Sequence, residues 1–168
     1  MVDNINQEFQ YKYIGFWKRV LAILIDIIFL IPIAILYLKT YKYFVSHKMI
    51  APVLIYYILI YAYHIFFITK YGGTPGKLLT KIKIVNKNCE NLSIKQVLLR
   101  YSPQILGTLI FLIMNFYNLN SEQNKVLKLI NSLIGYFTMA DVLVIVFDNK
   151  KRAIHDYIAG SFVISKKL

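Results

Sequence analysis

The amino-acid sequence predicts an all-α transmembrane fold: a four-helix membrane bundle with both termini in the cytoplasm and a small two-stranded cytoplasmic sheet. Hydrophobic residues make up 58% of the 168 residues, and the mean hydropathy is +0.53. Four apolar stretches approach the roughly 20 residues that a helix needs to cross the hydrocarbon core of a bilayer. We therefore expect a single membrane domain over residues 1–168.

The four predicted spans cover residues 20–38, 50–68, 101–119 and 126–147. The first contains Asp26 and Pro32, and the second has Pro52 in its first turn, where the missing N–H of proline does little harm. The third is the weakest, since its apolar residues 105–117 would extend only about 20 Å as a helix. A cleaved signal peptide does not fit the first stretch, because the apolar run is longer than a typical h-region and no A-x-A-like site follows it.

The distribution of basic residues favours four spans. With the N-terminus inside, the inner segments carry 15 of the 20 Lys and Arg residues and the outer segments carry five, which is the bias expected of cytoplasmic loops. Three spans would instead place the basic run 150–152 outside. The formal net charge of +12 therefore reflects orientation in a lipid bilayer, and we expect no nucleic-acid partner.

Two cytoplasmic segments are predicted, a loop over residues 70–100 and a tail over residues 148–168. Residues 81–85 alternate polar and apolar side chains like a half-buried strand, and residues 161–165 offer a mate, because a lone strand leaves its backbone unpaired. Residues 93–100 predict a short amphipathic helix. Residues 148–160 predict a surface helix that ends at Gly160.

The sequence contains no motif that indicates enzyme chemistry. Residues 73–77, GTPGK, lack the spacing of a phosphate-binding loop, and Leu78 stands where Ser or Thr is needed, so we expect a tight turn. His155 and Asp156 have no serine or cysteine nucleophile at a readable spacing, and no zinc pattern is present. We therefore expect no enzymatic activity, no cofactor and no metal, and the single Cys89 has no partner for a disulfide within the chain.

Three ionisable residues within the predicted spans are candidate site residues. Asp26 lies seven residues beyond Arg19, about 10 Å deeper in the membrane if Arg19 sits at the headgroups. Asp141 lies at a comparable depth in the last span, and His64 belongs to the same inner layer of the second. A charged aspartate at mid-span costs about 3 kcal/mol, so such residues face a bundle interior, find partners or become protonated.

Two interpretations of these residues stay open. In the functional one, Asp26, Asp141 and His64 form a proton or cation site, because carboxylates supply oxygen ligands and closely placed like charges force one of them to hold a proton. In the structural one, the aspartates pair with Arg19, Arg100 or lysine residues and only fix helix packing.

Four segments resemble the RDD family of prokaryotic membrane proteins: Gly15-Phe16-Trp17-Lys18-Arg19 followed by Asp26, residues 73–77, residues 95–100, and the tail motif RAIHDYIAGS over residues 152–161. The resemblance implies that Arg19, Asp26 and Asp156 are the residues that give the family its name; Asp141 is not among them. It implies a multi-pass protein of the prokaryotic cytoplasmic membrane and a role in transport, which in some members is cation/proton exchange.

The resemblance also implies a geometric alternative for two of the named residues. Arg19 at the inner interface would pair with Asp156 of the tail and lock the cytoplasmic sheet against the first helix. In this arrangement both residues are structural, and Asp26 is the remaining functional candidate. The further residues with a structural or interface role are Arg100, Arg152 and His155.

The sequence thus supports two hypotheses about function. The first is a carrier or exchanger that moves a small cation or couples a small solute to protons, with Asp26 as the titrating group. The second is a membrane scaffold or accessory subunit whose partner supplies the activity. Because four helices make a small transporter, we expect a homo-oligomer.

Overall fold

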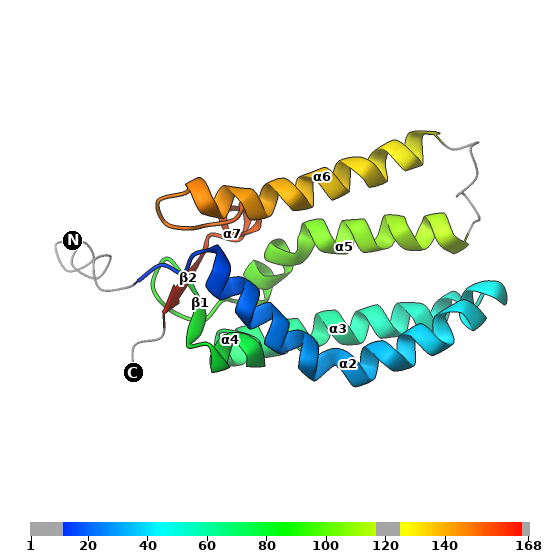
Figure 1. Ribbon diagram of the computed structural model, residues 1–168, viewed down its shortest axis with the longest axis horizontal. Coiled ribbons are helices and arrows are strands. Elements are labelled where there is room, and N and C mark those ends of the chain that lie inside the picture. The colour runs from blue at the N-terminus through cyan, green and yellow to red at the C-terminus, as the bar shows by residue number, and fades with distance from the viewer. Residues whose placement is uncertain (1–11, 117–124, 166–168) are drawn as a thin grey trace.

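The computed structural model describes residues 12–116 and 125–165. In chain order its elements are α2 (Phe16–Ser46), α3 (Ile50–Tyr71), α4 (Pro75–Leu79), β1 (Ile82–Asn86), α5 (Ile94–Phe116), α6 (Lys125–Phe147), α7 (Ile154–Ile158) and β2 (Ser161–Ser165). Figure 1 shows α2, α3, α5 and α6 as long helices, with β1, β2, α4 and α7 gathered at one end. We call this end the sheet end.

Within the described residues, three helical stretches are long and apolar enough to cross a membrane: α2, α3 together with α4, and α5. Many of their apolar side chains are exposed, such as Leu36, Ile58 and Leu106, as expected of surfaces that lipid covers. The apolar part of α6, Ser132–Phe147, is shorter. The protein is therefore mostly helical with membrane-type helices. The four-span topology with cytoplasmic termini stays a prediction.

Two helices extend beyond the elements predicted for them. Figure 1 shows α2 changing direction along its length, and this helix contains Pro32, which removes a backbone hydrogen bond and crowds the preceding turn. α5 continues through Pro103, because the hydroxyl of Ser102 donates to the Leu99 carbonyl at 2.8 Å, the acceptor that proline leaves unpaired. The predicted amphipathic helix over 93–100 is thus the first part of α5. Residues 117–119 of the third predicted span lie outside the described residues.

The sheet confirms the predicted pairing of residues 81–85 with residues 161–165. β1 and β2 are antiparallel, in a register that runs from Ile82 opposite Ser165 to Asn86 opposite Ser161. β1 begins one residue later than predicted, since Lys81 has a φ of 57°. Neighbouring chain covers both edges: Ile14 N–H donates to the Val163 carbonyl at 2.9 Å, and Ile84 N–H to the Gly72 carbonyl at 2.6 Å. Within the described residues, neighbouring chain therefore lies along both edges of the sheet, where it hinders association with another strand.

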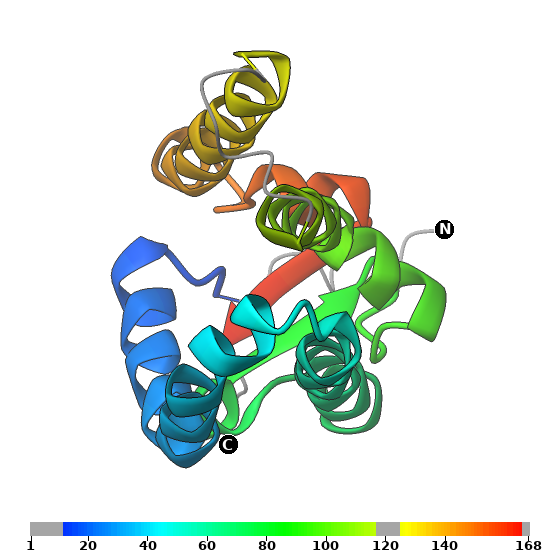
Figure 2. The same cartoon turned by 90° about the vertical axis from the view of Figure 1, so that its right-hand side faces the viewer.

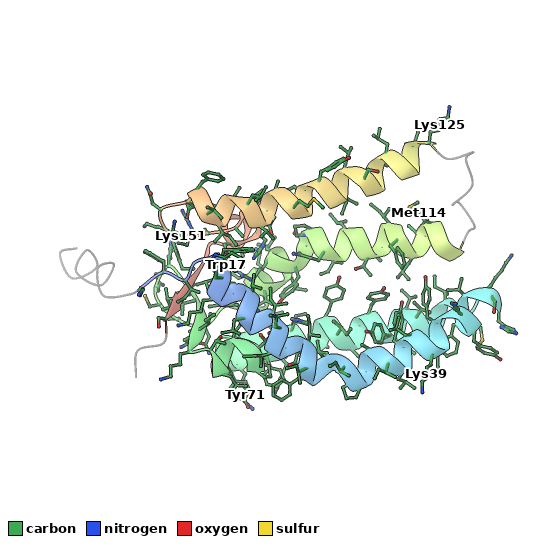
Figure 3. All side chains as sticks on the ribbon, viewed as in Figure 1. Trp17, Lys39, Tyr71, Met114, Lys125 and Lys151 are labelled. Carbon is green, nitrogen blue, oxygen red and sulfur yellow. The ribbon has the colours of Figure 1, made fainter. Side chains whose placement is uncertain are left out.

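The packed interior lies where the sheet meets α2, α3 and α5. In the view along the helices (Figure 2), these three helices stand around the sheet, and α6 lies beyond α5. Each fully buried aliphatic side chain contributes about 1.5–3 kcal/mol, so this end is the most strongly packed part of the described chain. Its buried apolar cluster comprises Ile14, Ala22, Ile68, Ile82, Ile84, Leu92, Val97 and Val163. Figure 3 places Trp17 and Lys151 at the sheet end, and Lys39, Met114 and Lys125 toward the opposite end.

The tail does not form the single helix predicted over 148–160. Only α7 is helical there, and the preceding residues form a turn. Lys151 has a φ of 53°, a left-handed conformation that a continuous helix cannot contain. The carboxylate of Asp148 accepts a hydrogen bond from the Arg152 N–H at 2.8 Å, which stabilises the turn.

Candidate functional site

Asp156 is the centre of an ion cluster at the sheet end. Its side chain is fully buried, and the guanidinium groups of Arg19 and Arg100 lie against its two oxygens. Arg19 Nη1 donates to Asp156 Oδ2 at 2.7 Å, and Arg100 Nη1 donates to Oδ1. The Ala153 N–H adds a bond to Oδ2 at 3.0 Å. The pairing of Arg19 with Asp156 that the resemblance implied is therefore present.

Arg19 joins three parts of the chain. From α2, its Nε donates to the Ile14 carbonyl at 3.1 Å, and its Nη2 donates to the Lys151 carbonyl. Together with the bond to Asp156, these contacts tie the first helix to the segment before it and to the tail. A planar guanidinium with five donors suits such a junction, which a lysine could not reproduce.

Asp141 of α6 binds the neighbouring residue of the tail, His155. The backbone N–H of His155 donates to Asp141 Oδ1 at 2.8 Å, and Nδ1 lies 2.6 Å from Oδ2. His155 Nε2 faces Asp156 Oδ1 at 3.6 Å. Burial and the charge of Arg100 lower the pKa of His155, and outweigh the two carboxylates, which raise it. The neutral imidazole donates its Nδ1 proton to Asp141, so Asp141 and His155 connect α6 to the ion cluster.

Because of the ion cluster, we expect the folded protein to become less stable as the pH falls. The lowered pKa of His155 means that folding favours the neutral ring, so its contribution is complete above the unfolded value of about 6.5 and is lost as the pH falls through it. Burial raises the pKa of Asp156, but Arg100 and Arg19 outweigh it and the net pKa is lowered, so its contribution is lost below about pH 3.9. We expect the melting temperature in detergent to fall between pH 7.5 and 5, and again below pH 4. His155→Asn should remove the first decrease and leave the second.

Asp26 is held by the turn that precedes α4. Its side chain is buried in α2. The Thr74 hydroxyl donates to Oδ2 at 2.5 Å, and the Gly76 N–H donates to Oδ1 at 2.7 Å. Gly76 is the second residue of α4, whose N–H has no partner within the helix. Asp26 therefore acts as a capping side chain supplied by another helix.

Gly76 lets α4 approach α2 closely. A Cβ atom at Gly76 would lie 2.8 Å from both the backbone nitrogen and the Cγ of Asp26, and closer still to the Ala22 carbonyl oxygen. Only glycine allows this contact of backbone with backbone. The GTPGK segment was predicted as a tight turn; Gly73 lies in a bend, and from Pro75 the segment enters α4, a short helix docked on α2 and held by Asp26.

The three membrane candidates do not share direct contacts. Asp26 binds the 74–76 turn, and Asp141 binds His155. His64 Nδ1 lies 2.8 Å from the Ile60 carbonyl oxygen, which accepts its proton. Arg152 stacks on the rings of Tyr157 and Phe162, with Cζ to centroid distances of 3.7 and 4.9 Å. No group of three or more metal-ligating side chains is assembled within the residues described.

Polar side chains lie between α3 and α5, and His64 is the one among them that was predicted as a site residue. Three on α3 recur at i, i+4 and i+7, and three on α5 at i, i+3 and i+7, so each set shares one helix face. We call them the polar rows: Tyr57, Tyr61 and His64 of α3, with Tyr101, Gln104 and Thr108 of α5. All six are half-buried. The spacing was the signal that could have found the others.

Direct contacts join the two polar rows. The hydroxyls of Tyr61 and Thr108 lie 2.8 Å apart, and the rings of His64 and Tyr101 have centroids 5.3 Å apart. Tyr57 continues the row toward α2, with its hydroxyl 3.2 Å from that of Tyr37. The buried Gln104 Oε1 has no hydrogen-bond partner in the described part of the chain.

The comparisons with known proteins give one match. The model of the RDD family matches residues 13–160, a range that includes Arg19, Asp26 and Asp156. No curated protein and no solved structure matches the chain.

Proposed function

The chain belongs to the RDD family, and from this premise we propose that it is a multi-pass protein of the prokaryotic cytoplasmic membrane that transports a small solute coupled to protons. The observation that carries the proposal is the pair of polar rows between α3 and α5. Polar groups within a membrane are costly and are characteristic of substrate and proton pathways. The sheet end, which we place in the cytoplasm, lies at one end of these rows.

The chemistry of the polar rows suits a proton or a small polar solute. The hydroxyl pair of Tyr61 and Thr108 can donate and accept in either direction, and the two ring nitrogens of an imidazole such as His64 can donate or accept a proton. Gln104 Oε1 has a free lone pair that a passing donor can use. The row from Tyr57 through Tyr61 to His64 rises about 10 Å along α3, which is about a third of the roughly 30 Å hydrocarbon core of a bilayer.

The engagement of the carboxylates by fixed donors supports a proton-coupled solute over a small metal cation. Both oxygens of Asp26, of Asp141 and of Asp156 already accept hydrogen bonds from fixed protein donors. A metal ion would need these oxygens as ligands. We therefore assign Asp26 a positioning role, and the polar rows replace it as the proposed pathway.

The second candidate, a scaffold or accessory subunit, has its own supporting observation. Large apolar side chains stay exposed along every long helix, including Leu133 and Phe147 of α6 and Leu38 of α2. Lipid, further copies of the chain or a larger partner can cover these faces. This candidate requires no pathway between α3 and α5.

A proton-flux assay tests the proposal. Purified protein is reconstituted into liposomes with an entrapped pH-sensitive dye, and a potassium gradient with valinomycin drives protons inward. We expect flux above protein-free liposomes, and about tenfold less with Tyr61→Phe, because one missing hydroxyl interrupts the pathway. Tyr136→Phe is the matched control, since this side chain is 68% exposed on α6, and its flux should equal that of the wild type.

Asp26→Asn in the same assay separates positioning from titration. We expect a lower melting temperature with unchanged flux per folded molecule. Lost flux at an unchanged melting temperature would return Asp26 to the role of titrating group. Absence of flux from the wild type across pH 5 to 8 would reject transport of protons and favour the scaffold.

A further inference from the structure

A groove with a volume of about 730 Å³ lies between α2 and α3 and is open along one side. On α2 its lining extends from Phe29 to Phe44, and on α3 from Pro52 to Phe67, a rise of about 22 Å along each helix. Pro75 of α4 lines it at the sheet end. The groove therefore follows the helix axes, and we call it the α2–α3 groove.

The α2–α3 groove belongs to the membrane-type part of the chain. Both of its walls are formed by helical stretches that are long and apolar enough to cross a membrane. Large aliphatic side chains of these walls are exposed, among them Leu36, Ile55 and Leu59. A length of about 22 Å covers most of the roughly 30 Å hydrocarbon core of a bilayer. The open side of the groove therefore faces hydrocarbon.

The polar groups of the lining are turned away from an occupant. The Thr40 hydroxyl donates to the Leu36 carbonyl at 2.9 Å, and the Tyr37 hydroxyl is bonded to that of Tyr57 at 3.2 Å. The hydroxyl oxygen of Tyr63 is buried, so it does not lie on the groove surface. A bound water molecule needs two to four polar partners. The groove therefore favours an apolar occupant over water or a polar solute.

The width of the groove distinguishes a hydrocarbon chain from a helix. The rings of Tyr37 and Tyr56 stack with centroids 3.9 Å apart, which holds α2 and α3 close together. The volume corresponds to a mean cross-section of about 33 Å² over the length of the groove. A helix with its side chains is about 10–12 Å across, too wide for this space. An extended hydrocarbon chain is one carbon wide, and carbon atoms in contact lie about 3.5–4.0 Å apart.

We propose that the α2–α3 groove binds one acyl chain of a membrane phospholipid, extended along the helix axes. An empty groove leaves its lining without contacts on one side, and a bound chain restores them. Because the surrounding lipid is as apolar as the groove, packing and not the hydrophobic effect provides the affinity. This lipid site is independent of the transport function and is tested by lipid binding alone.

Native mass spectrometry of the full chain in detergent, titrated with dipalmitoyl phosphatidylcholine, tests the proposal. We expect saturable binding of one lipid per chain, and binding at least about tenfold weaker by Leu36→Trp, because the larger ring occupies the groove. Leu38→Trp is the matched control and should bind like the wild type. Leu36 and Leu38 are 65% and 69% exposed on the same helix, but they lie on different faces, and of the two only Leu36 lines the groove.

Melting temperatures in the same titration give a second readout. A ligand that binds only the folded state stabilises it, so added lipid should raise the melting temperature of the wild type and of Leu38→Trp more than that of Leu36→Trp. If Leu36→Trp is already destabilised without lipid, Leu59→Trp from the opposite wall decides, with Ile58→Trp as its control. Leu59 lines the groove, whereas Ile58 is 62% exposed outside it.

Dihexanoyl phosphatidylcholine separates recognition of the chain from recognition of the headgroup. It carries the same headgroup on short chains, so we expect binding at least about tenfold weaker than that of the long-chain lipid, since most of the groove stays empty. Equal affinity for the two lipids would assign binding to the headgroup and overturn the proposal. Absence of saturable binding, or equal binding by Leu36→Trp and Leu38→Trp, would also overturn it. A dimer that Leu36→Trp dissociates would assign the groove to a second copy of the chain instead.

Discussion

Asp156→Asn is expected to destabilise the protein by about 3–5 kcal/mol, because it leaves two buried guanidinium groups without their counter-charge. Asp156 is fully buried, and the side chains of Arg19 and Arg100 are only 9% and 7% exposed. Asparagine keeps the shape of the side chain but offers one acceptor where the arginines use two. Their mutual repulsion then acts without compensation. The melting temperature of the purified protein in detergent should fall by at least about 6 °C.

Asp148→Asn provides the matched control for Asp156→Asn. Asp148 also faces an arginine, but its side chain is 15% exposed and lies 3.9 Å from Arg152. A pair of this kind contributes about 0–1 kcal/mol, and the bond from the Arg152 N–H to Asp148 adds about 1 kcal/mol, so we expect a smaller decrease than for Asp156→Asn. Equal melting temperatures for the two variants would show that the ion cluster does not hold the tail to α2 and α5.

Gly76→Ala is expected to cost about 3 kcal/mol, at the upper end of the range for added atoms in packed interiors. The added methyl group would overlap the backbone of α2 at Ala22 and Asp26. A side-chain rotation cannot relieve this overlap, so α4 must move away. The bonds from Thr74 and Gly76 to Asp26 are then lost together, and Asp26 is left as an unpaired carboxylate. We expect a lower melting temperature and faster proteolysis of the 72–80 segment.

Gly135→Ala tests whether the Gly76 effect depends on contact. A Cβ atom at Gly135 meets nothing within 4 Å, and alanine has the better helix propensity, so stability should stay equal or rise by up to about 1 kcal/mol. An unaltered melting temperature for Gly76→Ala would contradict the close docking of α4 on α2.

Local pattern was sufficient to predict the sheet and the membrane-type helices. The alternation in residues 81–85 and the β-rich residues 161–165 identified both strands, and the strands pair as expected. Apolar run length identified α2 and α3. These features depend on the spacing of apolar residues along the chain, so they can be predicted from a single sequence.

The partners of Asp26 could not be predicted from the sequence. Arg19 and Asp26 lie on the same helix, but their partners come from different segments: Arg19 pairs with the Asp156 carboxylate of the tail, and Asp26 accepts from the Thr74 hydroxyl and the Gly76 N–H. Thr74 and Gly76 can reach Asp26 only because Gly76 allows α4 to touch α2. Such a contact depends on the packing of distant segments, whereas propensity describes neighbours in the chain.

The polar rows escaped prediction for a different reason. Tyrosine side chains are also enriched at the ends of membrane spans, where they anchor the helix at the interface, so tyrosines such as Tyr57 and Tyr61 do not by themselves indicate a polar face. Their spacing with His64 follows the heptad of a helix face. Whether that face meets lipid or another helix depends on α5, which joins the helix predicted over 93–100 to the span predicted after it.

The covered sheet has a consequence for biogenesis. β2 and Asp156 are translated after α6, yet they complete contacts with α2, β1 and α5. A nascent chain halted after α6 therefore holds Arg19 and Arg100 without their shared carboxylate and β1 without its mate. The sheet end can therefore close only after the C-terminal segment has been translated.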